Sequence, residues 1–204
     1  MFITFEGPNG VGKTTVIKAV SDKLSNLGFD VLLTREPTKS NLGDFLRSSE
    51  ESYGGACLAC IAAADRYFHI EREIQPALSE GKLVISDRYV ESSLVLQRLD
   101  SCTLEFVWSL HSQIPIPDLS IILVAKPAIL SQRMVLRGKK LSRFERSGTR
   151  QKELRFYREA GKFLSQKGFN VFVLKNESDT VEKLASRIVQ KIQGLHQQKK
   201  GGVS

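Results

Sequence analysis

Long apolar runs, cysteine and tryptophan are scarce in this sequence, and each scarcity narrows the class of protein. No stretch approaches the roughly 18 consecutive apolar residues of a membrane-spanning helix, and the first residues read as a strand rather than a signal peptide. Of the 204 residues, three are cysteine and one is tryptophan. Cys57 and Cys60 have no second cysteine pair or nearby histidine in the sequence to complete a metal site. We therefore expect a cytoplasmic protein in which Cys57, Cys60 and Cys102 are buried free thiols.

Charge is plentiful, with a positive surplus. The chain has 30 Lys and Arg against 22 Asp and Glu, a net charge of +8, and 41% of its residues are apolar, as in a globular protein. Such a surplus suits a protein that holds several phosphate groups, and nucleic-acid binding is the weaker interpretation. Much of it lies between Arg133 and Arg158 and at Lys199 and Lys200. We expect residues 197–204 to form a flexible basic tail.

The most specific motif is a glycine-rich segment near the start of the chain. Residues 2–6 read as a buried strand, residues 7–14 match the pattern G-x-x-x-x-G-K-T, and an amphipathic segment follows. Glycines bring backbone N–H groups against phosphate oxygens at a helix N-terminus. Lys13 supplies a charge for the β- and γ-phosphates, and the Thr14 hydroxyl is the expected Mg²⁺ ligand. The predicted ATP-binding residues are Gly7, Pro8, Asn9, Gly10, Val11, Gly12, Lys13, Thr14 and Thr15.

Apolar strands alternate with helical patterns along the rest of the chain. Further strands are predicted at residues 30–34, 83–87, 118–124 and 169–174, and helices near 42–48, 55–79, 92–112, from 127, up to 164, and 180–195. Continuous apolar strands in this alternation imply a parallel sheet covered on both faces. The predicted fold is therefore α/β, a three-layer P-loop NTPase fold with a five-stranded parallel sheet, in a single domain over residues 1–196.

Charged residues follow several of these strands. Ligands of such sheets bind at the carboxyl ends of the strands, where Arg35, Asp87 and Arg88 fall. Asp87 is expected near Mg²⁺. The guanine-reading pattern Asn-Lys-x-Asp of a GTPase is not matched by the nearest text, residues 175–178. Arginines that can grip phosphates instead favour a small kinase acting on an anionic acceptor.

Several motifs together resemble the thymidylate kinase family. They are the segment from Phe5 to Thr15, Thr34-Arg35-Glu36-Pro37, Leu42-Gly43 with Arg47, Ala64-Asp65-Arg66, Val84 to Tyr89 with Ser92-Ser93, Pro117-Asp118-Leu119, and Arg137 with Arg143-Phe144-Glu145. The resemblance runs over nearly the whole chain. It implies transfer of the γ-phosphoryl group of MgATP to a nucleoside monophosphate, with dTMP as the first acceptor, and a homodimer. Small and apolar residues around Cys57–Ala64 and Glu105–Leu110 fit such an interface.

The resemblance also implies a role for each matching residue. Lys13 and Thr14 would hold ATP phosphates and Mg²⁺, with Asp87 in the metal shell. Arg47 and Arg88 would grip the acceptor phosphate, Arg66 would face the acceptor base, and Glu36 would order water or metal between donor and acceptor. Because residues 8–11 contain no arginine, Arg137 and Arg143 would supply charge from a lid at about 137–150, as in the bacterial branch. The predicted catalytic residues are Lys13, Glu36, Arg88, Arg137 and Arg143; the predicted acceptor contacts are Asn9, Arg47, Ala62, Arg66, Arg88, Ser93, Leu96 and Gln97.

Three positions depart from the family pattern. Asn9 stands where the family usually has an acid, Ala62 where a phenylalanine stacks on thymine, and Leu96 where a tyrosine crowds the sugar 2′ position. A lost stacking contact is worth about 1–3 kcal/mol per base, and a lost tyrosine removes a reason to reject ribose. One hypothesis is therefore a paralogue that phosphorylates another, modified or larger nucleotide.

A helix register that differs by one residue would also account for these departures, as would stacking by Tyr67, Phe68 or Tyr89. A regulatory nucleotide-binding protein without catalysis is a further interpretation, which the intact phosphate-loop residues disfavour. The three histidines, His69, His111 and His196, are expected to lack convergent partners, and none is predicted to act as a base, because an acceptor phosphate is already an anion.

Overall fold

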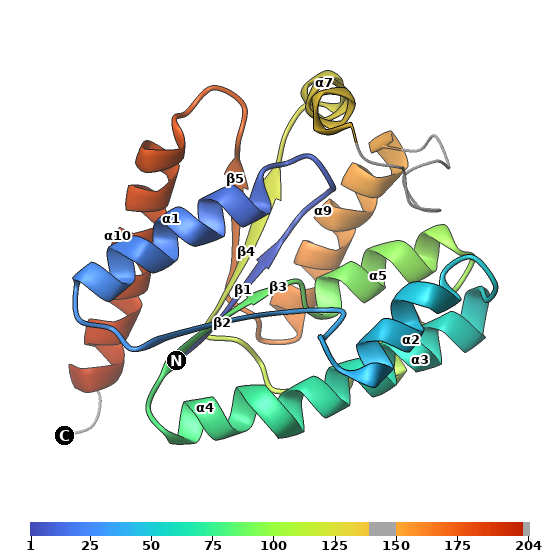
Figure 1. Ribbon diagram of the computed structural model, residues 1–204, viewed down its shortest axis with the longest axis horizontal. Helices are drawn as coiled ribbons and strands as arrows, with labels where there is room; N and C mark the ends of the chain where they lie inside the picture. The colour runs from blue at the N-terminus through green and yellow to red at the C-terminus, as the bar shows by residue number, and fades with distance from the viewer. Residues whose placement is uncertain (139–149, 202–204) are drawn as a thin grey trace.

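Five parallel strands form one sheet at the centre of the molecule (Figure 1). The computed structural model describes residues 1–138 and 150–201, apart from the side chains of residues 137 and 200. The strands lie in the order β2-β3-β1-β4-β5, which confirms the predicted five-stranded sheet. Their bounds are β1 Phe2–Glu6, β2 Val31–Arg35, β3 Leu83–Asp87, β4 Leu119–Val124 and β5 Val171–Lys175.

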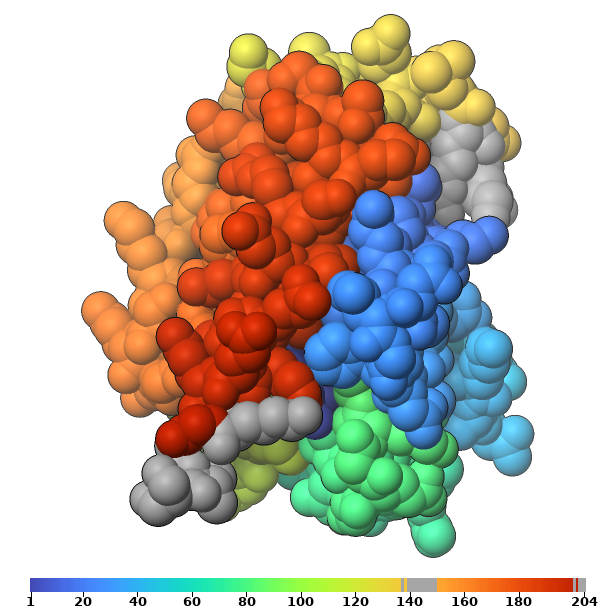
Figure 2. All heavy atoms as spheres, turned by 90° about the vertical axis from the view of Figure 1, so that its left-hand side faces the viewer, coloured from blue at the N-terminus to red at the C-terminus, as the bar shows by residue number. Residues whose placement is uncertain are grey.

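Helices cover both faces of the sheet, because successive strand residues point to opposite sides. Ile3 and Phe5 pack beneath α1 (Lys13–Asn26) and α10 (Val181–Gly201), which lie side by side (Figure 2). Phe2 belongs to the core on the opposite face. The elements there are α3 (Gly55–His69), a π-helical turn (Ile70–Ile74), α4 (Gln75–Ser79), α5 (Val90–Leu99), α6 (Leu104–Ser109) and α9 (Arg150–Gln166). In addition, α2 (Asn41–Ser49) packs on α3, and α7 (Pro127–Arg137) follows β4.

The central position of β1 explains where a ligand can bind. The chain passes from β1 to the edge strand β2, returns to β3 beside β1, and then crosses β1 to β4 on its other side. The connections therefore change direction at β1, and the loops after neighbouring strands part there to leave a crevice. Parallel register brings Phe5 opposite Asp87, and Asp87 opposite Arg35. The residues predicted at strand ends are therefore neighbours along one edge of the sheet.

The prediction of one continuous helix over residues 92–112 is wrong, because the structure has two helices there. Helix α5 ends at Leu99, Ser101 has a positive φ of 71°, and α6 starts at Leu104. The Asp100 carboxylate accepts a hydrogen bond of 2.5 Å from the Gly55 backbone N–H, and the Thr103 hydroxyl caps α6 by accepting from Phe106 N–H. The Thr103 cap favours a new helix start at Leu104, and the Asp100 contact ties the end of α5 to the first residue of α3.

Two further expectations need correction. The last helix continues to Gly201, so residues 197–201 are helical rather than a flexible tail, and Lys199 forms an ion pair with Asp118. Cys57 and Cys60 are free but exposed, and Cys102 is half-buried. Within residues 1–138 and 150–201, no helix combines the length and apolar character needed to cross a membrane.

Candidate active site

The phosphate loop between β1 and α1 needs its first glycine for steric reasons. Gly7 has a φ of 137°, and a Cβ there would lie 2.2 Å from the Leu123 carbonyl oxygen. Gly10 and Gly12 also have positive φ values, of 83° and 91°. The loop can therefore fold back tightly over the end of β4, which directs it toward the start of α1.

Lys13 is the first residue of α1, and its side chain turns back into this loop. Its Nζ donates hydrogen bonds to the carbonyl oxygens of Gly7 at 2.6 Å and Pro8 at 3.3 Å. Burial and the nearby Arg88 cation lower the pKa of Lys13 to about 7, against the raising effect of Asp87. The ammonium is thus poorly stabilised by the protein alone, which makes it a strong site for an anion.

Asp87 and Thr14 have the chemistry of an Mg²⁺ site. The Thr14 hydroxyl lies 3.5 Å from Asp87 Oδ2. Asp87 Oδ1 is buried, and no hydrogen-bond partner for it occurs among the described residues. An unpaired carboxylate oxygen beside a hydroxyl fits a hard cation that keeps several waters and phosphate oxygens as its remaining ligands. The residues present therefore fit the predicted Mg²⁺.

One large cavity joins these groups to the residues predicted for the acceptor phosphate. Its volume is about 770 Å³, enough for ligands of nucleotide size. The following residues, predicted from the sequence as site residues, line this cavity: Asn9, Gly10, Gly12, Lys13, Thr14, Thr15, Glu36, Arg47, Asp87 and Arg88. Arg35 also lines it. The predicted donor and acceptor phosphate sites thus share one open space.

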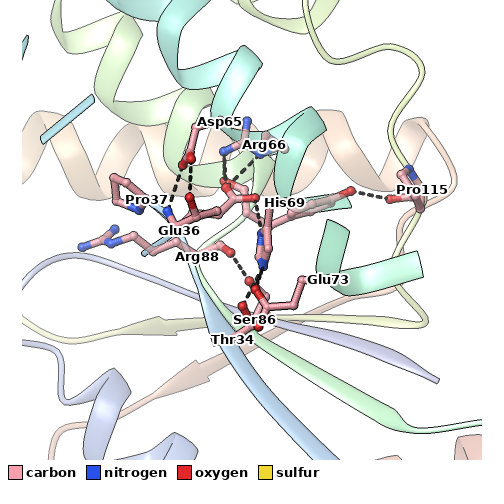
Figure 3. A network of polar contacts seen from close by, with 12 residues as sticks. Thr34, Glu36, Pro37, Asp65, Arg66, His69, Glu73, Ser86, Arg88 and Pro115 are labelled. Carbon is pink, nitrogen blue, oxygen red and sulfur yellow. Dashed lines mark hydrogen bonds and ion pairs between the residues drawn. The ribbon is translucent and has the colours of Figure 1, made fainter. Parts of the chain in front are cut away.

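A buried ion pair backs this cavity (Figure 3). The Glu36 carboxylate accepts two hydrogen bonds from Arg66, from Nε at 2.9 Å and from Nη2 at 2.6 Å. Burial alone would raise the pKa of Glu36, but Arg66 and His69 outweigh it and hold that pKa below its ordinary value. Glu36 is therefore an ionised carboxylate fixed at the cavity wall.

The expectation that no histidine has convergent partners was wrong for two of the three. His69 Nδ1 lies 3.2 Å from the Glu36 carboxylate, and its Nε2 lies 2.7 Å from the Thr34 hydroxyl. His111 Nε2 lies 3.0 Å from Arg66 Nη1. No local pattern signals these contacts, because the segments that make them are joined only by the fold.

Arg88 is held by contacts from the phosphate loop and from the first turn of α5. Its Nη2 donates to Asn9 Oδ1 at 2.6 Å and its Nη1 to the Ser92 hydroxyl at 3.0 Å. Its backbone has a φ of 83°, an uncommon conformation for a residue with a side chain. The uncharged Asn9 amide oxygen therefore orients the Arg88 guanidinium by accepting a hydrogen bond from it.

Glu6, the last residue of β1, fixes the turn between Arg88 and α5. Its carboxylate accepts hydrogen bonds from the backbone N–H groups of Tyr89 at 2.6 Å and Ser92 at 3.1 Å. A residue of β1 thus caps the N-terminus of α5. Burial raises the pKa of Glu6 although Arg88 lowers it. Burial and Glu6 together raise the pKa of the neighbouring Glu91 to about 8. This buried acidic cluster was not predicted.

Arg47 reaches the cavity from α2. Its Nη1 donates to the Pro37 carbonyl oxygen at 2.9 Å, and its Nη2 forms an ion pair with Asp44. Helix α2 lies close enough to the preceding loop that a Cβ on Gly43 would be 2.1 Å from the Thr38 carbonyl oxygen. Gly43 thus allows the approach that brings Arg47 to the cavity.

Most of the chain matches a known protein family. The sequence profile described as thymidylate kinase matches residues 5–188. The chain belongs to the thymidylate kinase family. It is 38% identical over 151 residues to a probable thymidylate kinase of Caldivirga maquilingensis, covering 72% of this chain and 73% of that protein. It is 39% identical over 164 residues to a probable thymidylate kinase of Pyrococcus horikoshii, covering 76% and 78%. A thymidylate kinase of Bacillus licheniformis is 41% identical over 102 residues, 48% of each chain.

Five residues that family resemblance assigns to the acceptor base and sugar are not among the residues that line the described cavity. Ala62, Arg66, Ser93 and Gln97 are buried, and Leu96 is half-buried; these five are absent from the described lining. Gln97 Oε1 is buried, and among the described residues it has no hydrogen-bond partner.

The alternative stacking residues differ in their surroundings. Tyr89 is fully buried, with its ring 5.1 Å from that of Phe2, so it offers no free face. Phe68 is exposed and Tyr67 is half-buried. Ala62 packs with Leu46 and Leu58 in a small apolar cluster between α2 and α3.

Several residues that line the cavity were not among the predicted site residues: Arg35, Pro37, Arg133, Asn176, Asp179 and Val181. Arg133 on α7 donates to the Asn176 carbonyl oxygen at 3.0 Å, and Asn176 Nδ2 donates to the Val11 carbonyl oxygen at 2.7 Å. Both line the cavity with Asp179. The position of Asn176 just after the last strand was a usable signal, since ligands gather at strand ends. Arg143 and the side chain of Arg137 lie outside the described residues.

Proposed function

We propose that the protein transfers the γ-phosphoryl group of MgATP to dTMP, forming ADP and dTDP. The observation that carries this proposal is one cavity in which the phosphate-loop lysine, an arginine on α2 and an arginine just after β3 face the same space. Lys13, Arg47 and Arg88 line it together. One cation would suffice to bind one nucleotide, whereas transfer between two phosphorylated molecules requires positive charge around both.

The donor half of the cavity is formed by the phosphate loop and the segment after β5. The triphosphate would lie along the loop N–H groups and Lys13, with Mg²⁺ held by Thr14 and Asp87. Bound there, Mg²⁺ would neutralise charge on the β- and γ-phosphates. Arg133, whose guanidinium is fixed by the Asn176 carbonyl oxygen, would flank the adenine.

The acceptor half is formed by residues from α2, from the phosphate loop and from the segments after β2 and β3. Arg47 and Arg88 would bind the acceptor phosphate, with Asn9 keeping the Arg88 guanidinium in place. Glu36 belongs to this half as a carboxylate at the cavity wall, suited to order a water where the acceptor meets the donor. The acceptor oxygen is already ionised at neutral pH, so transfer needs positioning and charge compensation rather than a general base. Arg137 and Arg143 would add charge from the lid.

The relatives' name, thymidylate kinase, supports dTMP as the acceptor. Gln97, whose buried Oε1 has no hydrogen-bond partner among the described residues, would offer its amide to the polar edge of the base. Arg66 would support this half through Glu36. Of the departures from the family pattern, the half-buried Leu96 would leave the sugar edge open, whereas Ala62 packs with Leu46 and Leu58 and opens no space beside the base.

A substrate panel tests the proposal. ADP release would be measured with MgATP and each of dTMP, dUMP, UMP, CMP, GMP and AMP, with Lys13→Ala as the inactive control. We expect dTMP to give a kcat/KM at least about tenfold above every other acceptor. A higher value for another monophosphate would overturn the choice of dTMP, and ATP binding without turnover of any acceptor would overturn the kinase assignment.

We further propose a cytoplasmic homodimer. Free thiols in a chain of this size suit a reducing compartment. On α3, the exposed residues Cys57, Cys60, Ala64 and Phe68 recur at helical spacing, a stripe that a second copy would cover. Light scattering should give the mass of a dimer, and Ala64→Arg should give a monomer. A monomeric wild-type protein would refute the dimer.

A further inference from the structure

Arg66 uses every hydrogen-bond donor that a guanidinium has. It carries five N–H groups, and the structure gives each of them an acceptor. Nε and Nη2 both donate to Glu36 Oε2, and Nη2 also donates to the Tyr89 carbonyl oxygen at 2.8 Å. Nη1 donates to the Ser93 hydroxyl at 2.9 Å and to the His111 ring. Arg66 is only 3% exposed, so its orientation is set by these protein groups.

His111 is the member of this set that family resemblance does not assign. It lies in the turn after α6 and is fully buried. Its backbone is fixed by a 2.8 Å hydrogen bond from His111 N–H to the Trp108 carbonyl oxygen. Burial and the Arg66 cation lower the pKa of His111, so the imidazole is neutral and offers one ring nitrogen as an acceptor. Nε2 lies 3.0 Å and Nδ1 3.3 Å from Arg66 Nη1, so this N–H approaches the ring from above its plane and lies nearer to Nε2.

We propose that His111 is a positioning residue for the acceptor half of the active site. By accepting from Arg66 Nη1, it fixes the guanidinium plane, and through that plane it holds Glu36 at the cavity wall. This inference rests on the proposed function, because it assigns Glu36 to the acceptor half. His111 itself touches neither nucleotide.

The loss of this acceptor has a defined consequence. A buried N–H group without a partner is costly, so the guanidinium would turn toward another acceptor. Both contacts to Glu36 come from the same rigid plane, so they would change with it. The donor half is separate, since Lys13 is held by the carbonyl oxygens of Gly7 and Pro8. A defect should therefore appear with the acceptor and not with ATP.

Steady-state kinetics of three variants tests this step. His111→Leu removes the acceptor, His111→Gln places an amide oxygen near the Nε2 position, and His111→Asn near the Nδ1 position. For His111→Leu, we expect kcat/KM for dTMP to fall about tenfold, with KM for MgATP within about twofold of wild type. One of the two amide variants should restore kcat/KM for dTMP to within about threefold and identify the accepting nitrogen.

Several outcomes would overturn the proposal. They are an unchanged kcat/KM for dTMP in His111→Leu, equal losses for dTMP and ATP, or a folded pair of amide variants that both remain as impaired as His111→Leu. If wild-type protein does not phosphorylate dTMP, the proposed function fails instead, and the substrate that it does accept takes the place of dTMP in these assays.

A measurement on the wild-type protein covers the case in which His111→Leu does not fold. The ¹⁵N chemical shifts of the His111 ring distinguish protonated from unprotonated nitrogens. We expect one unprotonated nitrogen at neutral pH, and a shift of that signal in Arg66→Lys, which cannot offer the same planar donors. A doubly protonated ring, or a ring signal that does not respond to Arg66→Lys, would overturn the proposal without any activity assay.

Discussion

Arg66 binds Glu36 through two N–H groups that meet at one carboxylate oxygen, 2.9 Å from Nε and 2.6 Å from Nη2. Both side chains are buried. The pair joins α3 to the loop after β2, and His69 contacts the other carboxylate oxygen of Glu36. A buried pair of this kind adds little net stability over an apolar pair, but the loss of one partner leaves a buried charge uncompensated.

Arg66→Met should therefore destabilise the protein by about 3–5 kcal/mol at neutral pH. In the wild type, Arg66 holds the pKa of Glu36 below its unfolded value, so this carboxylate stabilises the fold above its unfolded pKa and loses that effect as pH falls through its folded pKa. The deficit of Arg66→Met should shrink toward acid, where Glu36 takes up a proton. Urea unfolding at several pH values measures it.

The exposed Arg72 provides the matched control, since it lies further along the same helical segment. Arg72→Met should change stability by less than about 0.5 kcal/mol. A deficit for Arg66→Met that stays constant from neutral to acid pH would show that the ion pair is not its origin.

What the sequence could predict depends on whether the signal is local. The phosphate loop is local, because Gly7 to Thr14 carry both their conformation and their chemistry within one turn, and the strands follow from apolar runs. The break between α5 and α6 depends on Asp100 meeting the Gly55 N–H, 45 residues away in sequence. No periodicity reports such a contact.

The same distinction applies to the site. Arg47, Asp87 and Arg88 were predictable because each stands in a motif next to a strand or helix end. The contact of Arg66 with His111 joins residues 45 apart, and each histidine alone looked like an ordinary core or surface residue. The hydrogen bond from Arg133 to the Asn176 carbonyl oxygen likewise joins residues that only folding brings together.

Gly43→Ala and Gly194→Ala form a matched pair of helix substitutions with opposite expected signs. A Cβ on Gly43 would lie 2.1 Å from the Thr38 carbonyl oxygen, and Thr38 cannot easily yield, because Asp65 holds its N–H at 2.9 Å and its hydroxyl at 2.6 Å. We expect Gly43→Ala to cost about 1–3 kcal/mol and to lower kcat/KM for the acceptor by displacing Arg47.

A Cβ on Gly194 would meet no described heavy atom within 4 Å. Gly194→Ala should therefore stabilise α10 by about 0.5–1 kcal/mol through helix propensity. Thermal unfolding and steady-state kinetics of both variants check these signs. Equal stability of the two variants would contradict the close contact at Gly43.

Asp87→Asn should raise the Mg²⁺ concentration needed for half-maximal activity by about tenfold or more, because an amide replaces the carboxylate whose Oδ1 is unpaired among the described residues. Binding of metal-free ATP should change little or improve, since negative charge near the phosphates is removed. A titration of the initial rate with Mg²⁺ measures the shift. Asp22→Asn, an exposed change on α1, is the control; coincident curves for the two variants would exclude Asp87 from the metal site.

Lys13 should take up a proton when ATP binds at alkaline pH. Burial and Arg88 lower its pKa from 10.5 to about 7, so above pH 7 the free protein holds Lys13 mainly in its neutral form. A triphosphate beside the amine favours the charged form and raises this pKa again. Calorimetric titrations with ATP in buffers of different ionisation enthalpy should give an uptake that rises from near zero at about pH 5.5 to about one proton at about pH 8.5.

Lys13→Arg separates this effect from other titrating groups. Arginine stays charged across the whole range, so the variant should retain any proton exchange due to Glu91, whose pKa is about 8, and lose the part due to Lys13. Between about pH 7 and pH 10.5, Lys13 binds a proton in the unfolded chain but not in the folded one. The free energy of unfolding of the ligand-free wild type should therefore rise with pH in that window, compared with that of Lys13→Arg. Identical proton uptake in the two proteins would mean that the buried lysine is already charged before ATP arrives.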